Sequence, residues 1–161
     1  MLEQDDELFC IDTSALIHAW NRDYPPDVFG TIWENLEILI AAGSLISPEE
    51  VLLELERGGD EIYDWAKSQA SMFVKPGSSV QAKVRHIVNA YRSFLPDHSR
   101  DGIWADPYII ALAIEEHAIV VTGEKPVGLN ARAPKIPNIC NDLGVDCTDM
   151  LGLIRICGWQ F

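Results

Sequence analysis

Short apolar runs alternate with longer segments of helical spacing along almost the whole chain. Five runs are short and apolar enough to predict buried strands, at residues 8–11, 45–46, 73–74, 118–122 and 145–147. Between them, apolar residues recur every three or four positions, which predicts helices at 15–20, 26–42, 51–57, 60–70, 78–94, 106–117, 139–143 and 150–156. This alternation predicts an α/β fold with a central parallel β-sheet flanked by helices on both faces.

Two of the predicted helices begin with recognisable signals. Ser47-Pro48-Glu49-Glu50 combines a serine, a proline at the first helical position and a glutamate three residues after the serine, which predicts a capping box. Asp106-Pro107 predicts the start of a helix that is apolar nearly all round and is therefore expected to be buried. The 161 residues contain no repeat or linker, so we expect one domain over residues 1–161.

Four acidic residues stand beside these apolar segments: Asp12 after the first strand, Glu54 in a leucine-rich helix, Asp106 at the start of the buried helix, and Glu124 two residues after Thr122. An acid that directly follows a buried strand should lie at its carboxyl end, where a parallel sheet leaves a crevice. Each also has a simpler explanation. Asp12 and Asp106 are good helix caps, Glu54 can face solvent, and Glu124 can be an ordinary loop acid.

The charge of the chain restricts its partners. The formal net charge is −13, from 25 acidic and 12 basic residues, which is the opposite of what a general nucleic-acid binder carries. This objection weakens if several acids surround divalent cations, because the ions reverse the local charge. A basic protein partner would also neutralise the surface.

The cysteines and the apolar runs bear on the location of the protein. Cys10, Cys140, Cys147 and Cys157 form no CxxC pair or zinc-like spacing, so we expect reduced thiols and a cytoplasmic protein. Residues 1–7 are acidic and lack the pattern of a secretion signal. Because no apolar run approaches membrane-spanning length, no membrane association is expected.

The four acids occur in motifs that resemble those of a known family. A strand that ends in Ile-Asp-Thr-Ser at Asp12, the helix motif Ser-Pro-Glu-Glu-Val-Leu-Leu-Glu-Leu around Glu54, Ala-Asp-Pro-Tyr-Ile-Ile-Ala-Leu-Ala at Asp106 and Ile-Val-Val-Thr-Gly-Glu at Glu124 resemble the PIN domain over nearly the whole chain. PIN domains are metal-dependent ribonucleases that include the VapC toxins. Residues 135–140 and 144–147 are most similar to an uncharacterised PIN-like branch, the DUF4411 group.

The resemblance implies a catalytic and metal-binding set of Asp12, Glu54, Asp106 and Glu124. PIN toxins commonly carry an aspartate where this chain has Glu124, and Asp142 is a possible substitute for it. Thr13 or Ser14 corresponds to the hydroxyl that the family places near the metal, although helix capping explains these residues equally well. The resemblance also implies a cognate antitoxin protein and a possible homodimer.

Carboxylates support the same chemistry without reference to a family. Their oxygens suit Mg²⁺ or Mn²⁺, which bind through few protein ligands and many waters. Such an ion lowers the pKa of a bound water and offsets charge on a phosphodiester under attack. No histidine is needed as a base, and we expect surface or core positions for all four histidines: His18, His86, His98 and His117.

Substrate contacts would come from a few basic residues. Lys125, Arg132 and Lys135 follow Glu124 in one loop, and Arg100 precedes the buried helix. We interpret Lys125 and Arg132, together with Thr13 and Ser14, as substrate-binding, with solvated loop charges as the alternative for the two basic residues.

The sequence therefore predicts a PIN-type endoribonuclease that hydrolyses RNA with Mg²⁺ or Mn²⁺, as the toxin of a toxin-antitoxin pair. The alternative is a catalytically inactive PIN-like interaction protein that binds a basic partner through its acidic surface. A phosphatase of the haloacid dehalogenase type is disfavoured because Ser14 stands where its second aspartate is needed.

Overall fold

Five parallel strands form the centre of the protein. The computed structural model describes residues 7–58, 60–94 and 104–161. The strands run in the order β3-β2-β1-β4-β5, and each neighbouring pair is parallel. Their bounds are β1 Phe9–Ile11, β2 Leu45–Pro48, β3 Phe73–Val74, β4 Ile119–Val121 and β5 Cys147–Thr148.

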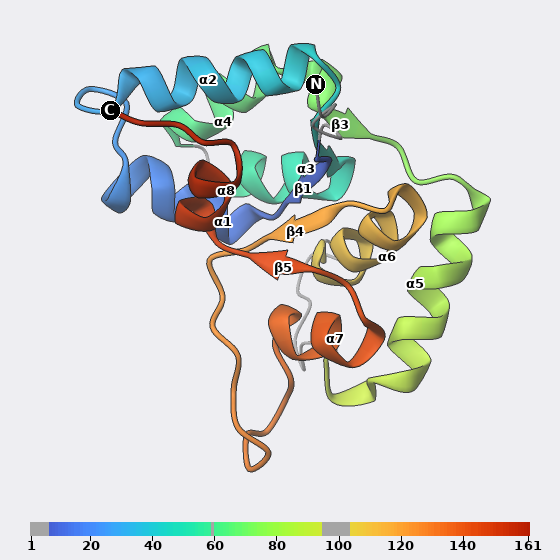
Figure 1. The fold of residues 1–161 in the computed structure, drawn as a ribbon. Helices are drawn as coiled ribbons and strands as arrows, with labels where there is room; N and C mark the ends of the chain where they lie inside the picture. Colours follow the sequence, from blue (N-terminus) through green and yellow to red (C-terminus); the bar gives the residue numbers. More distant parts are fainter. Residues whose placement is uncertain (1–6, 59, 95–103) are drawn as a thin grey trace, which may run out of the picture.

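Helices cover both faces of this sheet, as the sequence predicted. Figure 1 shows α5, α6 and α7 on one side and α1 to α4 with α8 on the other. The α-helices are α1 Thr13–His18, α2 Gly30–Ala41, α3 Glu49–Gly58, α4 Glu61–Ser68, α5 Ser78–Ala90, α6 Asp106–Glu116, α7 Ile136–Leu143 and α8 Met150–Ile156. A π-helical turn at Ala19–Asp23 prolongs α1, and 3-10 turns lie at Ala70–Met72 and Arg92–Phe94.

The central strands are apolar without alternation because both of their faces are covered. All three residues of β1 are buried, and β4 contributes Val120 and Val121 to the same core. The register places Ile11 beside Val121. The two strands therefore end together, at the same edge of the sheet.

Helix α6 is the buried helix that the sequence predicted. Its residues 109–113 are all buried, and it packs against β1, β2 and β4. Ala105, and not Asp106, is its N-cap residue, so Asp106 lies inside the first turn. The simpler explanation of Asp106 as a helix cap was therefore wrong, and its carboxyl instead accepts a hydrogen bond from the Trp104 side chain. The helix ends at His117, which has a left-handed backbone with φ of 55°.

The predicted capping box at residues 47–50 was also wrong. Ser47 and Pro48 belong to β2 and pair with β3, and α3 begins only at Glu49. The Ser47 hydroxyl is fully buried and donates a hydrogen bond to the Ile11 carbonyl, 2.7 Å away. The serine therefore joins β2 to β1 and is not free to cap a helix.

Several predicted boundaries moved by a few residues. Helix α2 begins at Gly30 and not near residue 26, because Val28 and Phe29 both donate to the Pro25 carbonyl in a separate turn. Helix α7 begins three residues earlier than predicted, with a proline in its first turn. The last strand is Cys147–Thr148, slightly later than the predicted 145–147. These shifts leave the order of elements unchanged.

Two further properties concern the cysteines and the helices. All four cysteines are unpaired, with Cys10 and Cys140 buried in the core. Within the described residues, no helix combines the length and apolarity that crossing a membrane requires.

Candidate functional site

The ends of β1 and β4 bring two acidic segments together. Asp12 directly follows β1, and its backbone N–H donates to the Val121 carbonyl at 2.9 Å. Thr122, Gly123 and Glu124 directly follow β4. Because the strands are parallel and adjacent, the two segments lie at the same edge of the sheet, as expected for a binding crevice in an α/β fold.

Asp12 serves both as a helix cap and as a wall of this crevice. It is buried, with 3% of its surface exposed. Its Oδ1 accepts a hydrogen bond from the Ala15 backbone at 2.9 Å, which makes it the N-cap residue of α1. The two sequence interpretations of Asp12 are thus compatible.

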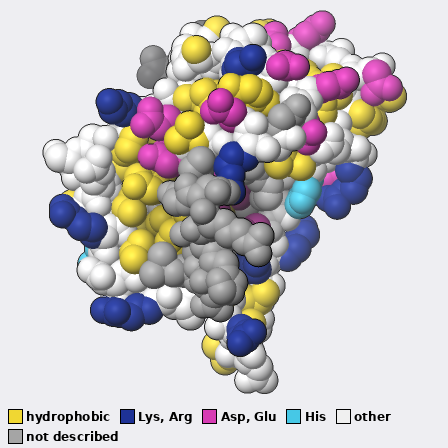
Figure 2. Space-filling view, turned by 180° about the vertical axis from the view of Figure 1, so that it is seen from behind, with side chains coloured by type: hydrophobic (Ala, Val, Ile, Leu, Met, Phe, Trp, Pro, Cys, Tyr) yellow, Lys and Arg dark blue, Asp and Glu magenta, His cyan; other side chains and the backbone are white. Residues whose placement is uncertain are grey.

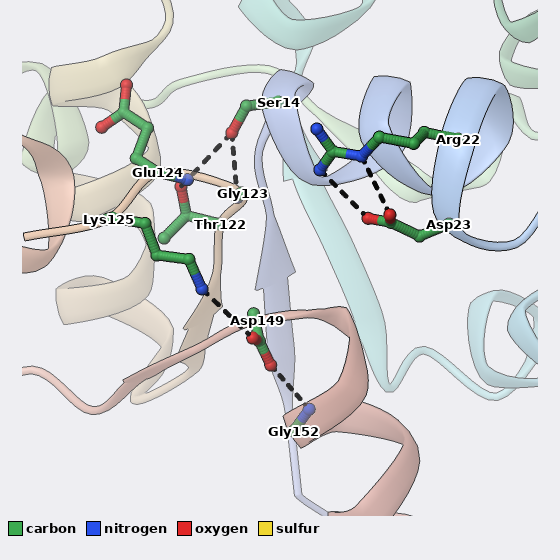
Figure 3. Close-up of polar contacts among 9 residues, drawn as sticks. All are labelled: Ser14, Arg22, Asp23, Thr122, Gly123, Glu124, Lys125, Asp149 and Gly152. Carbon is green, nitrogen blue, oxygen red and sulfur yellow. Dashed lines mark hydrogen bonds and ion pairs between the residues drawn. The ribbon is translucent and has the colours of Figure 1, made fainter.

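Two hydroxyls hold the Asp12 carboxylate in place. The Thr122 hydroxyl donates to Oδ2 at 2.6 Å, and the Ser14 hydroxyl donates to Oδ1 at 2.8 Å. Each hydroxyl also accepts a backbone hydrogen bond, Ser14 from Gly123 and Thr122 from Glu124 (Figure 3). The result is a closed network that joins the end of β4 to the start of α1.

Thr122 was missed as a site residue by the sequence analysis, which treated it as the end of a strand. It is buried, with 2% exposed, and its hydroxyl makes the shortest described hydrogen bond to Asp12. A signal was present: in parallel strands that end together, the residues after each strand are neighbours. Finding it required the pairing of β1 with β4, which the sequence does not state.

Glu54 joins three elements. Its Oε2 accepts from the Thr13 hydroxyl at 2.6 Å, and its Oε1 accepts from the Ala105 backbone at 2.8 Å. It thereby connects α3 to the start of α1 and to the start of α6. Both carboxylate oxygens already accept hydrogen bonds, so Glu54 organises the site whatever else it does.

The four predicted acids converge on a single cavity. Asp12, Glu54, Asp106 and Glu124 line a space of about 280 Å³, together with Thr13, Ser14, Ile17 and His18. The acids come from the end of β1, from α3, from the start of α6 and from the segment after β4. This convergence is what the sequence analysis required of a shared cation site.

Burial, together with the charges of neighbouring acids, raises the pKa of two of these carboxyls. Burial, followed by the charges of Glu124, Asp12 and Glu54, raises the pKa of Asp106 to about 7. Burial is also the main cause that raises the pKa of Asp12 to about 6, against the hydrogen bonds from Thr122, Ala15 and Ser14. Perturbed carboxyls in a cleft are a feature of functional sites.

The described side chains do not form a complete set of direct metal ligands. Among the described residues, no three His, Cys, Asp or Glu side chains are arranged to hold a metal ion directly. Glu54 is occupied by its two hydrogen bonds, and Glu124 Oε2 accepts from the Ile136 backbone at 2.9 Å. The arrangement suits an ion that keeps much of its water shell, as Mg²⁺ does when it binds one or two carboxylates.

The predicted basic residues lie outside the acidic cavity. The Lys125 ammonium is 3.8 Å from the Asp149 carboxylate and largely exposed (Figure 3), and Arg132 is exposed in the same loop. Lys135 is the N-cap residue of α7. Arg100 lies outside the described residues.

Asp142 does not take the place of Glu124. Its carboxylate is exposed on α7 and accepts a long, 3.4 Å hydrogen bond from the Tyr91 hydroxyl. It lines a separate, larger groove between α7, β5 and the loop after β4. Of the two candidates for the fourth acid, the structure brings only Glu124 into the cavity with Asp12.

The chain is similar to one family model and to several solved structures. A family model described as "Domain of unknown function (DUF4411)" matches residues 9–161. No curated protein matches the chain. The predicted PIN-like fold is confirmed by its similarity to two solved structures.

One is a chain from the structure of VapBC2 from Rickettsia felis, which is bound to a DNA fragment from the VapBC2 promoter. It is 17% identical to this chain, covers 88% of this chain and 98% of its own length, and gives a TM-score of 0.50. The other is a chain of VapBC-1 from nontypeable Haemophilus influenzae, with a TM-score of 0.54 and 14% identity over 88% and 97%. At such identities the similarity concerns the fold.

Proposed function

The chain belongs to the DUF4411 family, and from its site we propose that it is a metal-dependent endoribonuclease of the PIN type, which hydrolyses RNA phosphodiester bonds. One observation carries the proposal. Carboxylates from four separate elements line one cavity at the carboxyl ends of β1 and β4. Mutual repulsion makes this arrangement unfavourable unless a cation or a proton compensates it, so its presence indicates a role other than stability.

The donor set fits Mg²⁺ or Mn²⁺. All of the acidic groups in the cavity offer oxygen ligands, which hard divalent ions prefer. Asp12 and Asp106 would hold the ion, with Glu54 and Glu124 completing the site. When bound, the ion activates a water and offsets negative charge on the phosphodiester during in-line attack.

The residues of the chain itself prepare the site. Hydrogen bonds from Thr122, Ser14 and Ala15 orient Asp12, so its carboxylate needs little reorganisation. Glu54 fixes the start of α6, which carries Asp106. Near neutral pH, Asp106 holds a proton on its carboxyl for part of the time because its pKa is about 7, and it gives up that proton when a cation binds.

We extend the proposal to the biological setting. Two of the similar solved structures are of VapBC2 and VapBC-1, which supports an antitoxin partner for this chain and an action as the toxin of the pair. A homodimer remains part of this proposal. Four unpaired cysteines support a reducing, cytoplasmic location.

The test is cleavage of a single-stranded RNA by the purified protein with Mg²⁺ or Mn²⁺. Asp12→Asn and Asp106→Asn should each lower kcat by about 100-fold or more, because each removes a charge that the cation requires. Asp142→Asn is the matched control. It removes an exposed aspartate outside the cavity, and its activity should equal that of the parent protein.

Folding is checked in the same samples by circular dichroism and thermal unfolding. Chelation by EDTA should abolish cleavage, and added Mn²⁺ should restore it. Full activity of folded Asp12→Asn or Asp106→Asn would contradict the proposed mechanism. Equal losses in all three variants would show that charge in general, and not this cavity, controls activity.

A second candidate is an inactive PIN-like protein that binds a basic partner. The net charge of −13 favours it, and acidic side chains gather over the half of the molecule that carries α2 and α4 (Figure 2). Metal titration separates the two functions. An enzyme should show a rise in Tm with Mn²⁺ that Asp12→Asn removes, whereas an interaction protein should show neither.

A further inference from the structure

Among the described residues that line the acidic cavity, His18 is the one whose side chain can carry a positive charge. It lies in the last turn of α1, half-buried, six residues after Asp12. The sequence analysis expected a surface or core position for it. The structure instead places it at the wall of the cavity that Glu54, Asp106 and Glu124 also line.

The absence of a side chain at Gly123 leaves room for the His18 imidazole. A Cβ added to Gly123 would collide with His18 Nδ1 and would lie 3.0 Å from its Cε1. The ring therefore packs against the bare backbone of Gly123, in the segment that joins β4 to Glu124. Gly123 is itself tied to α1 through the hydrogen bond from its N–H to Ser14.

The ring has hydrogen-bonding capacity to spare. Within the described part of the chain, no hydrogen bond from either ring nitrogen is found. Nδ1 packs on Gly123, so Nε2 is the nitrogen left for a ligand. On the side of Asp23, His18 helps to lower the pKa of that carboxyl, after the larger effects of Arg22. A positioned ring with an unused nitrogen at a cavity wall is suited to contact a ligand.

We propose that His18 is a substrate-contact residue, which donates a hydrogen bond from Nε2 to a phosphate oxygen of the RNA backbone. This inference rests on the proposed ribonuclease function. It assigns His18 a role in binding RNA and leaves metal binding to the carboxylates. An N–H donor at the wall offsets part of the repulsion between an anionic strand and an acidic cavity.

Steady-state kinetics on a single-stranded RNA with Mn²⁺ test the inference. Relative to the parent protein, His18→Ala should raise KM about tenfold and leave kcat within about twofold, since one hydrogen bond to a charged group is lost. The rise in Tm with Mn²⁺ should be unchanged. His86→Ala is the matched control, because His86 is exposed on α5, outside the cavity, and its replacement should leave KM unaltered.

A conservative variant distinguishes a contact from a packing role. The amide nitrogen of glutamine reaches about as far as Nε2, whereas that of asparagine reaches only about as far as Nδ1. His18→Gln should therefore recover most of the lost affinity, and His18→Asn should not. If packing alone mattered, His18→Met, which has nearly the size of glutamine but no donor, would recover the affinity as well as His18→Gln does.

Gly123→Ala gives an independent test through the same ring. Its Cβ would displace the imidazole, so this variant should raise KM in the parent protein. In a His18→Ala background only the close approach of the added Cβ to the Ser14 backbone carbon, at 3.1 Å, remains, so adding Gly123→Ala should have a smaller effect. Additive effects of the two changes would contradict the proposed coupling.

The possible failures are distinguishable. If the parent protein cleaves RNA and folded His18→Ala has the same KM, the inference about His18 is wrong and the ribonuclease function stands. A fall in kcat with no change in KM would also overturn it. If the parent protein neither cleaves nor binds RNA with Mn²⁺ present, the proposed function itself fails.

Discussion

At the scale of single residues, the site disfavours the ionised form of two carboxyls. Asp12 and Asp106 are held in a cavity with Glu54 and Glu124, and burial raises the pKa of both above the ordinary value of an aspartate. Such groups favour the folded state while they are protonated and oppose it once they ionise. In the absence of a cation, the ionised carboxyls of Asp12 and Asp106 therefore lower the free energy of unfolding.

These raised pKa values predict an unusual pH dependence for the metal-free protein. Stability contributed by Asp12 and Asp106 is complete below the pKa of an unfolded aspartate and is lost as pH rises through about 6 and about 7. Chemical denaturation in EDTA should give a free energy of unfolding lower by about 2 kcal/mol at pH 8 than at pH 6. Saturating Mn²⁺ should remove most of this loss.

Asp106→Asn provides the control for this measurement. Without the ionisable group, the metal-free variant should be more stable than the parent protein at pH 8 and should depend less on pH. Asp142→Asn, which changes an exposed aspartate, should keep the parent dependence. A parent protein whose stability rises between pH 6 and pH 8 in EDTA would contradict the assignment.

At the scale of elements, the junction between β2 and α3 shows how tertiary contacts replace a local signal. Residues 47–50 have the composition of a capping box, but Ser47 is buried in the sheet and donates to the Ile11 carbonyl. Glu50 does not complete a box either. Its Oε2 is buried without a hydrogen-bond partner among the described residues, and burial raises its pKa.

Two substitutions separate the sheet contact from a cap. Ser47→Ala should lower the free energy of unfolding by about 1–2 kcal/mol, because the buried Ile11 carbonyl loses its donor. Glu50→Gln should be neutral or stabilising, since it removes the penalty of a buried charge. Ser68→Ala, which affects an exposed hydroxyl bonded to the Trp65 carbonyl, is the control with a small expected effect. A capping box, which accepts glutamate or glutamine at this position, would instead make Glu50→Ala destabilising relative to Glu50→Gln, as urea denaturation would show.

At the scale of the whole molecule, negative charge dominates. The net charge of −13 surrounds a cavity that is itself acidic. The described lysines near the cavity do not reverse this: Lys125 faces Asp149 and not the cavity. Under the proposed function, recognition of RNA would depend on local contacts and on bound cations, and not on a general attraction between opposite charges.

This charge distribution predicts a reversed response to salt. For a basic nucleic-acid binder, raising the salt concentration from about 50 to 200 mM weakens binding steeply. Here KM for RNA at constant Mn²⁺ should stay constant or fall over this range, because salt screens repulsion. The control is a protein with a known basic RNA-binding surface in the same assay. A steep rise of KM with salt would indicate a basic surface outside the described residues.

Four acids of the candidate site could be predicted because they adjoin apolar runs that form strands and helices. Asp12, Glu54, Asp106 and Glu124 were selected from their motifs, and they do converge. Thr122 and His18 were not selected as site residues. Their places depend on the pairing of β1 with β4 and on the packing of α1 against Gly123, neither of which leaves a local pattern.

The sequence by itself determined the class of fold, because hydrophobic periodicity reports directly which faces are buried, and it determined which acids adjoin strand and helix ends. Only the tertiary structure decided what each polar side chain contacts. The Ser47 hydroxyl donates to a neighbouring strand and does not cap a helix. Both carboxylate oxygens of Glu54 accept hydrogen bonds, one from Thr13 and one from Ala105. The physical reason is that a hydrogen bond depends on groups brought together by folding, whereas burial of an apolar face is a property of the segment alone.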